Sequence, residues 1–381
     1  MSTAAPRRVV VVGNGIAGLT AADTLREAGF DGELTVVGDE PHPAYSRPAL
    51  SKALLLDGDD LSSHALPPPG HGATELLGVR ATALDLERRR VTLDDGTDLP
   101  YDRVVLATGS RARRLSSSAG ELTLRGLDDA LALRARLADK PSVVVVVGGG
   151  PLGMEIASGC LASGCAVTLV TQGPPLILQL GPYLAEVFVR AARERGLTIV
   201  ETAAARPAGD EGTPRVVLAE GGVLEAEVVL TAAGDVPNTE WLAGSGLPAG
   251  GPVPVDARGL VRPDVAAVGD LAAFPTARGV RRVPLWSSAI EQAKTAARAL
   301  LRGTEAPPLD FQSYFWTEQF GLSLKAVGDL PVEGAPEYVD GEPGGGPALM
   351  RWPGPDGAAV AAALDYRIPI PRLRRMTKAA A

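Results

Sequence analysis

Cysteine is scarce in this chain: its 381 residues include only Cys160 and Cys165. Two cysteines exclude a framework of several disulfides and any metal site built from four thiolates. The three histidines, His42, His64 and His71, are scattered through a Pro/Gly-rich stretch, where we expect surface positions and no metal site. Long apolar runs are also lacking, because no stretch reaches the roughly 18 apolar residues that a spanning helix needs, so no membrane segment is expected.

No signal peptide is expected at the start of the sequence, which reads MSTAAPRRVVVVGNG. The first glycine turn comes too early to leave room for an apolar signal core and a cleavage site, which predicts a cytoplasmic protein. Positive charge is in deficit, since 37 Lys and Arg against 45 Asp and Glu give a net charge of −8. A chain this acidic is not expected to bind nucleic acid, and its length predicts two or three domains.

Glycine is abundant, and its first cluster forms a nucleotide-binding pattern. The segment RRVVVVGNGIAGLTAADTLREAGF predicts a buried strand, a glycine turn and a helix. Gly13, Gly15 and Gly18 form G-x-G-x-x-G, in which the first glycine permits the tight turn, the second lets backbone approach a pyrophosphate, and the third lets the helix pack on the strand. The next predicted strand ends in Asp39 and Glu40, where an acid can accept hydrogen bonds from a ribose diol.

The same pattern occurs a second time, much later in the chain. The segment KPSVVVVVGGGPLGMEIASGCLASGCAVTLVTQG supplies Gly148, Gly150 and Gly153 between a predicted strand and a predicted helix. Two separate motifs predict two bound dinucleotides. The alternative is that one copy is only a structural relic, and it is disfavoured because both copies keep all three glycines before a helix that begins cleanly.

The order of the remaining segments predicts an α/β fold with two Rossmann-like dinucleotide-binding domains, the second inserted in the first, and a C-terminal α+β domain. One strand ends in a turn at Ala107, Thr108 and Gly109, a later one in a return turn at Gly234, and a third in Gly269 and Asp270. Short strands with turns follow. The predicted boundaries are residues 1–110 and 236–307 for the first domain, 111–235 for the inserted domain, and 308–381 for the last.

A stiff basic loop, PAYSRPALSK, follows the second predicted strand. It carries Arg47 and Lys52 on a backbone that Pro43 and Pro48 restrict, so that placing the two charges costs less entropy when a ligand binds. Taken alone, the loop fits an anion-binding segment and a solvated basic loop equally well.

Together these residues resemble the FAD-dependent pyridine-nucleotide oxidoreductases of the glutathione-reductase fold, and within them the ferredoxin-reductase branch that serves oxygenases and cytochromes P450. The likeness covers nearly the whole chain through GNGIAG, YSRPALSK, ATGSRAR, GGGPLGMEIA, AVGDLA, VPLWSSAIEQAKTAARALL and YFWTEQF, in this order. RPALSK, the Trp286 segment and YFWTEQ are specific to the branch. Because Cys160 and Cys165 follow the second glycine motif and not the first, they are expected to be small buried residues and not a redox pair beside a flavin.

The resemblance implies FAD as the cofactor. Arg47 would face its pyrophosphate, Lys52 would lie close to the isoalloxazine, and Asp270 would bind the ribityl chain. Trp286 and Trp316 match family tryptophans that border the flavin, although most tryptophans are simply core residues. The contacts implied for FAD are Gly13, Gly15, Gly18, Asp39, Glu40, Arg47, Lys52, Ala107, Thr108, Gly109, Gly269, Asp270, Trp286 and Trp316.

The residues implied to be catalytic are Lys52, Glu155 and Trp316. Glu155, expected on the first turn of the second glycine-motif helix, resembles the family glutamate that pairs with the loop lysine; a simpler explanation is a favourable interaction with the helix dipole.

Thr171 departs from the family, which has an acid there to hold the adenosine ribose of NADH. No arginine stands in this loop for a 2′-phosphate, so NADH is expected, and NADPH stays open because arginines follow on the next helix. The remaining cofactor-binding residues are expected to be Gly148, Gly150, Gly153, Glu155, Thr171 and Gly234.

The reaction implied by the resemblance passes a hydride from the nicotinamide to the flavin and then single electrons to a ferredoxin or another small iron–sulfur protein. Since such ferredoxins are acidic, a local basic patch is expected near the flavin, and RLRRMTK (Arg372 to Lys378) is one candidate. Two alternatives stay open: a stand-alone flavin oxidase or reductase acting on a small molecule, and a redox-sensing protein similar to apoptosis-inducing factor. The sequence does not fix the oligomeric state.

Overall fold

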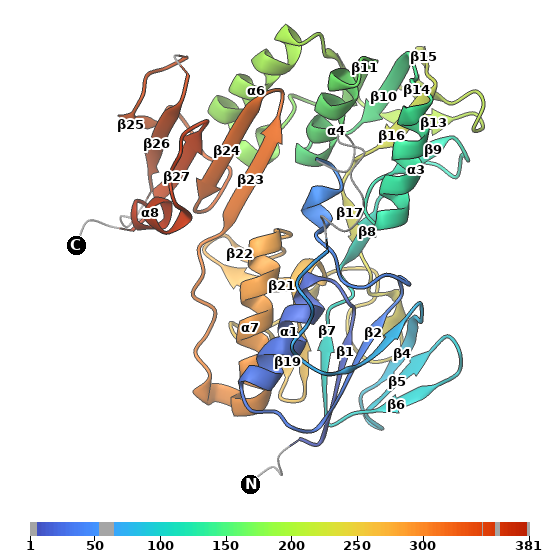
Figure 1. The fold of residues 1–381 in the computed structure, drawn as a ribbon, viewed down its shortest axis with the longest axis vertical. Coiled ribbons are helices and arrows are strands. Elements are labelled where there is room, and N and C mark those ends of the chain that lie inside the picture. The colour runs from blue at the N-terminus through green and yellow to red at the C-terminus, as the bar shows by residue number, and fades with distance from the viewer. Residues whose placement is uncertain (1–5, 53–64, 345, 355–358, 379–381) are drawn as a thin grey trace. The chain divides into compact units, whose positions relative to one another are not determined.

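The chain divides into two compact units (Figure 1). The computed structural model describes residues 6–52, 65–344, 346–354 and 359–378. Unit 1 consists of Met1–Ser46, Ser62–Arg111 and Val236–Phe311, and unit 2 consists of Arg47–Leu61, Ala112–Asp235 and Gln312–Ala381. The strands β8 (Ser110–Ala112) and β17 (Asp235–Pro237) stand where the chain passes from one unit to the other.

Unit 1 is built on a six-stranded sheet in the order β19-β20-β7-β1-β2-β3, in which every pair but β19 and β20 is parallel. The valine-rich runs of its inner strands are buried on both faces, as parallel strands between two layers require. Its strands are β1 Arg8–Val12, β2 Glu33–Gly38, β3 Thr74–Leu77, β7 Arg103–Leu106, β19 Leu260–Arg262 and β20 Val265–Ala267.

Two different layers cover the two faces of this sheet. Val9 and Val11 of β1 face a core shared with the helices α1 (Ile16–Glu27) and α7 (Trp286–Arg302), while Val10 and Val12 face a second core that small sheets complete. These small sheets comprise β4 Ala81–Asp85, β5 Arg90–Leu93, β6 Asp98–Pro100, β18 Val253–Pro254, β21 Ala272–Thr276 and β22 Gly279–Arg281. Short 3-10 turns complete the unit at η3 Glu240–Leu242, η4 Gly269–Leu271 and η5 Gly303–Glu305.

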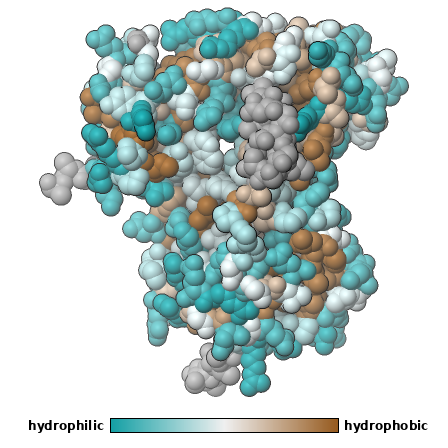
Figure 2. Space-filling model, in the orientation of Figure 1, coloured by the Kyte–Doolittle hydropathy of each residue, from teal (hydrophilic) through white to brown (hydrophobic). Residues whose placement is uncertain are grey.

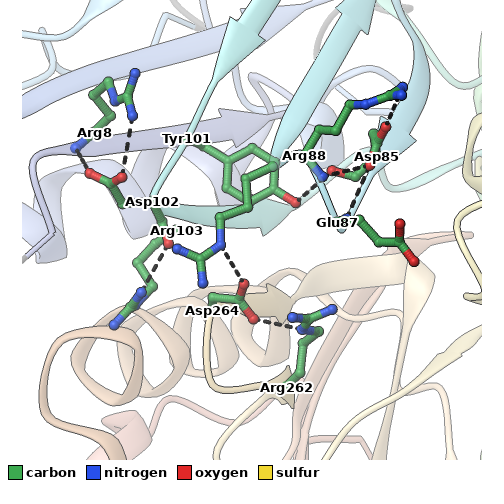
Figure 3. A network of polar contacts seen from close by, with 10 residues as sticks. Arg8, Asp85, Glu87, Arg88, Tyr101, Asp102, Arg103, Arg262 and Asp264 are labelled. Carbon is green, nitrogen blue, oxygen red and sulfur yellow. Dashed lines mark hydrogen bonds and ion pairs between the residues drawn. The ribbon is translucent and has the colours of Figure 1, made fainter. Parts of the chain in front are cut away.

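A polar network ties together the amino-terminal ends of the strands of unit 1 (Figure 3). The Asp102 carboxylate accepts the backbone N–H groups of Arg7 (2.8 Å) and Arg8 (2.9 Å), and so fixes the start of β1 beside the start of β7. Burial opposes ionisation of Asp102, but these N–H groups and the Arg8 guanidinium outweigh it and lower its pKa. Buried Tyr101 has its pKa raised to about 12, first by burial and then by the Asp264 carboxylate.

Asp264, which directly precedes β20, is expected to stabilise unit 1 without touching any ligand. Its side chain is buried and pairs with Arg262 Nε at 2.7 Å and Arg89 Nε at 3.5 Å. Replacing Asp264 by Asn should lower the free energy of unfolding by about 2 kcal/mol, because a charged hydrogen bond is lost from a buried site. The measurement is urea unfolding, with Asp98→Asn as the control.

The control removes an acid of the same unit whose ion pair with Arg90 is exposed and 3.8 Å long, so it should change the unfolding free energy by less than about 0.5 kcal/mol. Equal effects of Asp264→Asn and Asp98→Asn would contradict the stabilising role of Asp264.

Unit 2 contains a five-stranded sheet in the order β12-β11-β10-β16-β9, and all of its pairs are parallel. A small antiparallel sheet, β13-β14-β15, closes one apolar core over Val145, Val147, Val170 and Val229. The strands are β9 Glu121–Thr123, β10 Val143–Val147, β11 Ala166–Thr171, β12 Thr198–Glu201, β13 Ala205–Ala208, β14 Arg215–Leu218, β15 Val223–Glu225 and β16 Val228–Thr231. The helices are α3 Leu127–Ala138, α4 Pro151–Ala162, α5 Ile177–Leu180 and α6 Pro182–Glu194, and η1 covers Arg47–Ala49.

The carboxyl-terminal segment of unit 2 forms an antiparallel sheet in the order β23-β24-β27-β26-β25. It is joined to the Rossmann-like part by specific contacts: the Phe320 N–H donates to Ser158 Oγ at 2.7 Å, and the Val332 N–H donates to the Leu180 carbonyl at 3.2 Å. Its elements are β23 Tyr314–Gln319, β24 Leu322–Val327, β25 Glu337–Asp340, β26 Ala348–Pro353, β27 Ala359–Leu364 and α8 Ile370–Arg375.

The fold class predicted from the sequence is confirmed: two Rossmann-like sheets, the second inserted into the chain of the first, precede a C-terminal α+β segment. The exact domain boundaries stay a prediction. Cys160 and Cys165 are both buried and unpaired, and burial raises the pKa of the Cys160 thiol to about 12, which suits a packing role.

The expectation that the histidines lie at the surface is wrong for His71, which is only 2% exposed. Its carbonyl accepts Arg26 Nε at 2.8 Å, and its Nδ1 accepts the Ala73 N–H at 3.0 Å, so its loop is fastened to α1. His64 lies outside the described residues.

Hydrophobic residues on the face shown in Figure 2 form separate brown patches among hydrophilic residues. Leu178, Val280 and Val339 are among the large apolar side chains that are more than half exposed, and they stand far apart in the sequence. In the part of the chain that the structure describes, no helix has both the length and the apolar character needed to cross a membrane.

Candidate functional site

The first glycine motif forms the turn between β1 and α1, and two of its glycines are required by packing. A Cβ on Gly13 would lie 2.1 Å from the Ala107 carbonyl oxygen, and Gly13 has a φ of +117°, which only glycine adopts readily. A Cβ on Gly18 would lie 1.8 Å from the Gly13 carbonyl oxygen. Gly13 therefore allows the turn to approach the end of β7, and Gly18 allows α1 to pack against the turn.

Gly15 is different, because the protein itself gives no reason for a glycine there. A Cβ on Gly15 would meet no atom within 4 Å, and its φ of −89° and ψ of −173° suit any residue. Gly15 is the N-cap of α1, which has no side-chain cap and no acid in its first turn. The space beside Gly15 at the start of the helix is thus open, which fits the approach of an anionic group to the backbone N–H groups there.

The second motif repeats this geometry in unit 2. A Cβ on Gly148 would lie 2.3 Å from the Ala232 carbonyl oxygen, and one on Gly153 would lie 1.9 Å from the Gly148 carbonyl oxygen. A Cβ on Gly150 would meet nothing within 4 Å, and Gly150 is the uncapped N-cap of α4, with ordinary φ and ψ of −77° and 178°. Each unit therefore contains one anion cradle, defined as the glycine turn together with the first helical turn after it.

In unit 1 the other predicted residues, apart from Trp286, follow the carboxyl ends of strands in the sheet that carries its cradle. Ala107, Thr108 and Gly109 follow β7, and Thr108 Oγ1 donates to the Asn238 carbonyl at 2.7 Å. Gly269 and Asp270 follow β20, and a Cβ on Gly269 would lie 3.0 Å from Ala17 Cβ of α1. Asp39 and Glu40 follow β2, and Trp286 opens α7.

Asn14 adds a second observation at the cradle of unit 1. Its side-chain Nδ2 is buried, and it has no hydrogen-bond partner among the described residues. A buried donor without a partner costs free energy, and a ligand oxygen in the cradle would remove that cost. A dinucleotide phosphate or ribose offers such oxygens, so the residues present fit a bound dinucleotide in unit 1.

In unit 2 a cluster of polar side chains surrounds Glu155, which lies on α4 and is only 7% exposed. Its Oε2 accepts Lys52 Nζ at 2.9 Å and Ser51 Oγ at 2.5 Å, and its Oε1 accepts Thr317 Oγ1 at 2.6 Å. Thr317 in turn accepts Gln319 Nε2 at 2.9 Å. Three donors converge on one carboxylate, so its negative charge is stabilised and its position is fixed.

The structure corrects the expected position of Glu155. Helix α4 begins at Pro151 and has no acid in its first turn, so Glu155 lies on the second turn. The helix-dipole explanation weakens accordingly, because that effect falls off beyond the first turn. Sequence reasoning missed Ser51, Thr317 and Gln319; Ser51 and Thr317 stand directly beside the predicted Lys52 and Trp316, but nothing in the sequence showed that they meet.

The other predicted residues of unit 2 lie outside the cluster around Glu155 in the contacts that the structure gives them. Arg47 donates through its guanidinium to the Arg125 carbonyl at 3.0 Å, and Trp316 on β23 stacks on Tyr314 with ring centroids 5.5 Å apart. Thr171 ends β11, and the exposed Gly234 accepts the Arg113 N–H at 3.0 Å. These contacts leave the roles assigned to Arg47, Thr171, Gly234 and Trp316 as proposals.

Comparison with known proteins places these features in a family. The family model described as pyridine nucleotide-disulphide oxidoreductase matches residues 7–297. The ferredoxin–NAD(+) reductase component of the p-cumate 2,3-dioxygenase system of Pseudomonas putida is 35% identical over 333 residues, which covers 84% of this chain and 81% of that protein.

Two solved structures are similar over nearly the whole chain. The ferredoxin reductase for the CYP199A2 system from Rhodopseudomonas palustris superposes with a TM-score of 0.86 at 30% identity, covering 94% of this chain and 91% of that one. The covalent putidaredoxin reductase–putidaredoxin complex gives a TM-score of 0.85 at 28% identity, covering 97% of this chain and 92% of that one.

Proposed function

The chain belongs to the pyridine nucleotide-disulphide oxidoreductase family, and from this premise we propose that it is an FAD-dependent ferredoxin reductase. It takes reducing equivalents from NADH and passes single electrons to a ferredoxin that serves an oxygenase or a cytochrome P450. The relatives with this named role align with most of the chain, and the family model spans both glycine motifs. We include in the proposal a cytoplasmic location, which suits the two unpaired cysteines.

The observation that carries this proposal is the pair of anion cradles, each with a middle glycine that the fold does not require. The cradle of unit 1 would hold the FAD diphosphate through Gly13, Gly15 and Gly18, and the cradle of unit 2 would hold that of NADH through Gly148, Gly150 and Gly153. We assign further FAD contacts to Asp39, Glu40, Arg47, Lys52, Ala107, Thr108, Gly109, Asp270, Trp286 and Trp316.

Bound FAD would supply the redox chemistry, because a flavin accepts a hydride from NADH and returns its two electrons one at a time. The protein's own part is binding and alignment. Glu155 pairs with Lys52 and holds it in place, while Ser51 and Thr317 fix the carboxylate of Glu155. No residue needs to move a proton for the hydride to pass, so the catalytic role proposed for Lys52, Glu155 and Trp316 is to shape the reaction site.

The proposed partner is an acidic ferredoxin, and α8 is our candidate for part of its docking surface. Arg372 and Arg375 of this helix are exposed, and Lys378 follows it. Oppositely charged surfaces steer association and make it sensitive to salt.

The test is reduction of cytochrome c by NADH with and without an added [2Fe–2S] ferredoxin. The proposal predicts fast reduction only when ferredoxin is present, with a rate that falls as salt is raised. Fast NADH oxidation with a small molecule alone would instead indicate a stand-alone oxidase or reductase. A long-lived complex with NADH and little turnover would indicate a redox sensor.

A further inference from the structure

Position 171 at the end of β11 has no charge with which to hold a ribose. The Thr171 hydroxyl donates to the Gly173 carbonyl at 2.9 Å, and a Cβ on Gly149 would lie 2.6 Å from Thr171 Oγ1, so this side chain faces the glycine turn. The neighbouring Gln172 donates its amide to the Ala203 carbonyl at 3.1 Å. Both side chains are thus engaged within the protein, and neither is an acid.

Strand β12, which neighbours β11, carries an acid, Glu201, beside Thr171. Strands β11 and β12 are parallel, with Thr171 paired with Glu201 and the Thr202 N–H donating to the Thr171 carbonyl at 2.9 Å. Paired residues of parallel strands lie about 4.8 Å apart and point to the same face. The preceding pair, Val170 and Val200, shows this directly, because both pack into one apolar cluster on the opposite face.

Glu201 is available for a ligand. It is exposed, and among the described residues its side chain has no hydrogen bond or ion pair. Two other acids of unit 2 differ, since Glu220 accepts the Thr202 hydroxyl at 2.7 Å and Glu227 accepts the Ser142 N–H at 2.9 Å. Glu201 is therefore a free carboxylate beside Thr171, on the face that holds the glycine turn.

We propose that Glu201 accepts the hydroxyl groups of the adenosine ribose of NADH, in place of the acid missing at Thr171. The inference rests on the proposed function, in which the cradle of unit 2 holds the diphosphate of the nicotinamide dinucleotide. A carboxylate at this position accepts the 2′ and 3′ hydroxyls and repels a 2′-phosphate, so it favours NADH over NADPH.

Arg195, at the end of α6, is one of the arginines that could have bound a 2′-phosphate, but its side chain is held elsewhere. The Arg195 guanidinium donates to the Ala191 carbonyl at 3.4 Å. It also packs against Gly321, since a Cβ added to Gly321 would lie only 2.3 Å from Arg195 Nη2. Arg195 is thus held against the turn between β23 and β24, so it is not at hand to bind a 2′-phosphate.

The test is calorimetric titration of the FAD-loaded protein with ADP-ribose and with 2′-phospho-ADP-ribose, which measures binding without hydride transfer. Glu201→Gln should weaken ADP-ribose binding about tenfold, because a hydrogen bond to a charged acceptor is lost. It should leave the binding of 2′-phospho-ADP-ribose unchanged or stronger. Glu220→Gln removes a nearby charge that Thr202 already engages, and it should change the ratio of the two affinities by less than about twofold.

A double variant, Thr171→Glu with Glu201→Gln, moves the acid from β12 to β11. It should restore the preference for ADP-ribose over 2′-phospho-ADP-ribose. Unchanged affinities in Glu201→Gln, with normal ADP-ribose binding by the wild type, would overturn the role of Glu201 and leave the proposed function intact. Failure of the wild-type protein to bind ADP-ribose at all would overturn the second dinucleotide site itself, and this inference with it.

Discussion

Replacing Gly150 by alanine is expected to give a folded, yellow protein that is reduced only at much higher concentrations of NADH. The backbone of Gly150 suits alanine and its Cβ would meet no protein atom within 4 Å, so the melting temperature should stay the same or rise slightly. The added methyl group would occupy the space that the diphosphate needs, and overpacking of this kind should weaken NADH binding by about 100-fold. Calorimetry with ADP-ribose and the rate of flavin reduction measure the effect.

Gly15→Ala is the counterpart in unit 1 and should give a folded but colourless protein, because Gly15 stands in the same open position of the first cradle. Gly251→Ala is the matched control, since a Cβ there also meets nothing within 4 Å but the residue lies outside both cradles. Gly153→Ala is expected to prevent folding, because its Cβ would lie 1.9 Å from the Gly148 carbonyl oxygen. Normal NADH binding by the Gly150→Ala variant would contradict the proposal that the cradle of unit 2 holds the diphosphate of NADH.

Replacing Glu155 by glutamine should have the second large effect, on stability and on reduction by NADH together. The glutamine side chain keeps the shape but removes the charge, so Lys52 loses its ion pair and one of the two hydroxyl donors loses its acceptor. Breaking a largely buried pair from one side should lower the free energy of unfolding by about 3 kcal/mol. Reduction of the flavin by NADH should slow, whereas reduction by dithionite should not.

A double-mutant cycle with Lys52→Met separates the pair from its surroundings. Lys52→Met alone leaves Glu155 with two hydroxyl donors, and the variant with both substitutions should recover part of the stability that Glu155→Gln loses. A coupling free energy of about 2 kcal/mol is expected for the pair. Additive losses, or equal slowing of NADH and dithionite reduction, would show that Glu155 has no special role toward NADH.

Much of the fold followed from the sequence because its signals are local. Each glycine motif occupies six consecutive residues where a valine-rich strand passes into a helix, and spacing alone located both cradles. The motif also assigned a different role to each glycine. The structure adds the contacts, because a Cβ on Gly13 or Gly18 would overlap backbone atoms whereas one on Gly15 would meet nothing within 4 Å.

The polar surroundings of Glu155 could not be predicted in this way, because its partners are distant in the sequence. Ser51 is 104 residues away and Thr317 is 162 residues away, so no spacing rule connects them. Glu201 was missed for a similar reason, since its position beside Thr171 depends on the register of two parallel strands. The burial of His71 was missed because a Pro/Gly-rich segment predicts surface, whereas Arg26 fastens this one to α1.

The most direct test of the account is an anaerobic titration of the purified protein with NADH, followed in the visible spectrum. If two dinucleotide sites cooperate in one hydride transfer, the protein is yellow as purified and bleaches with about one NADH for each bound FAD. A folded but colourless protein that takes up no FAD, or a yellow protein that NADH does not bleach, would contradict the account.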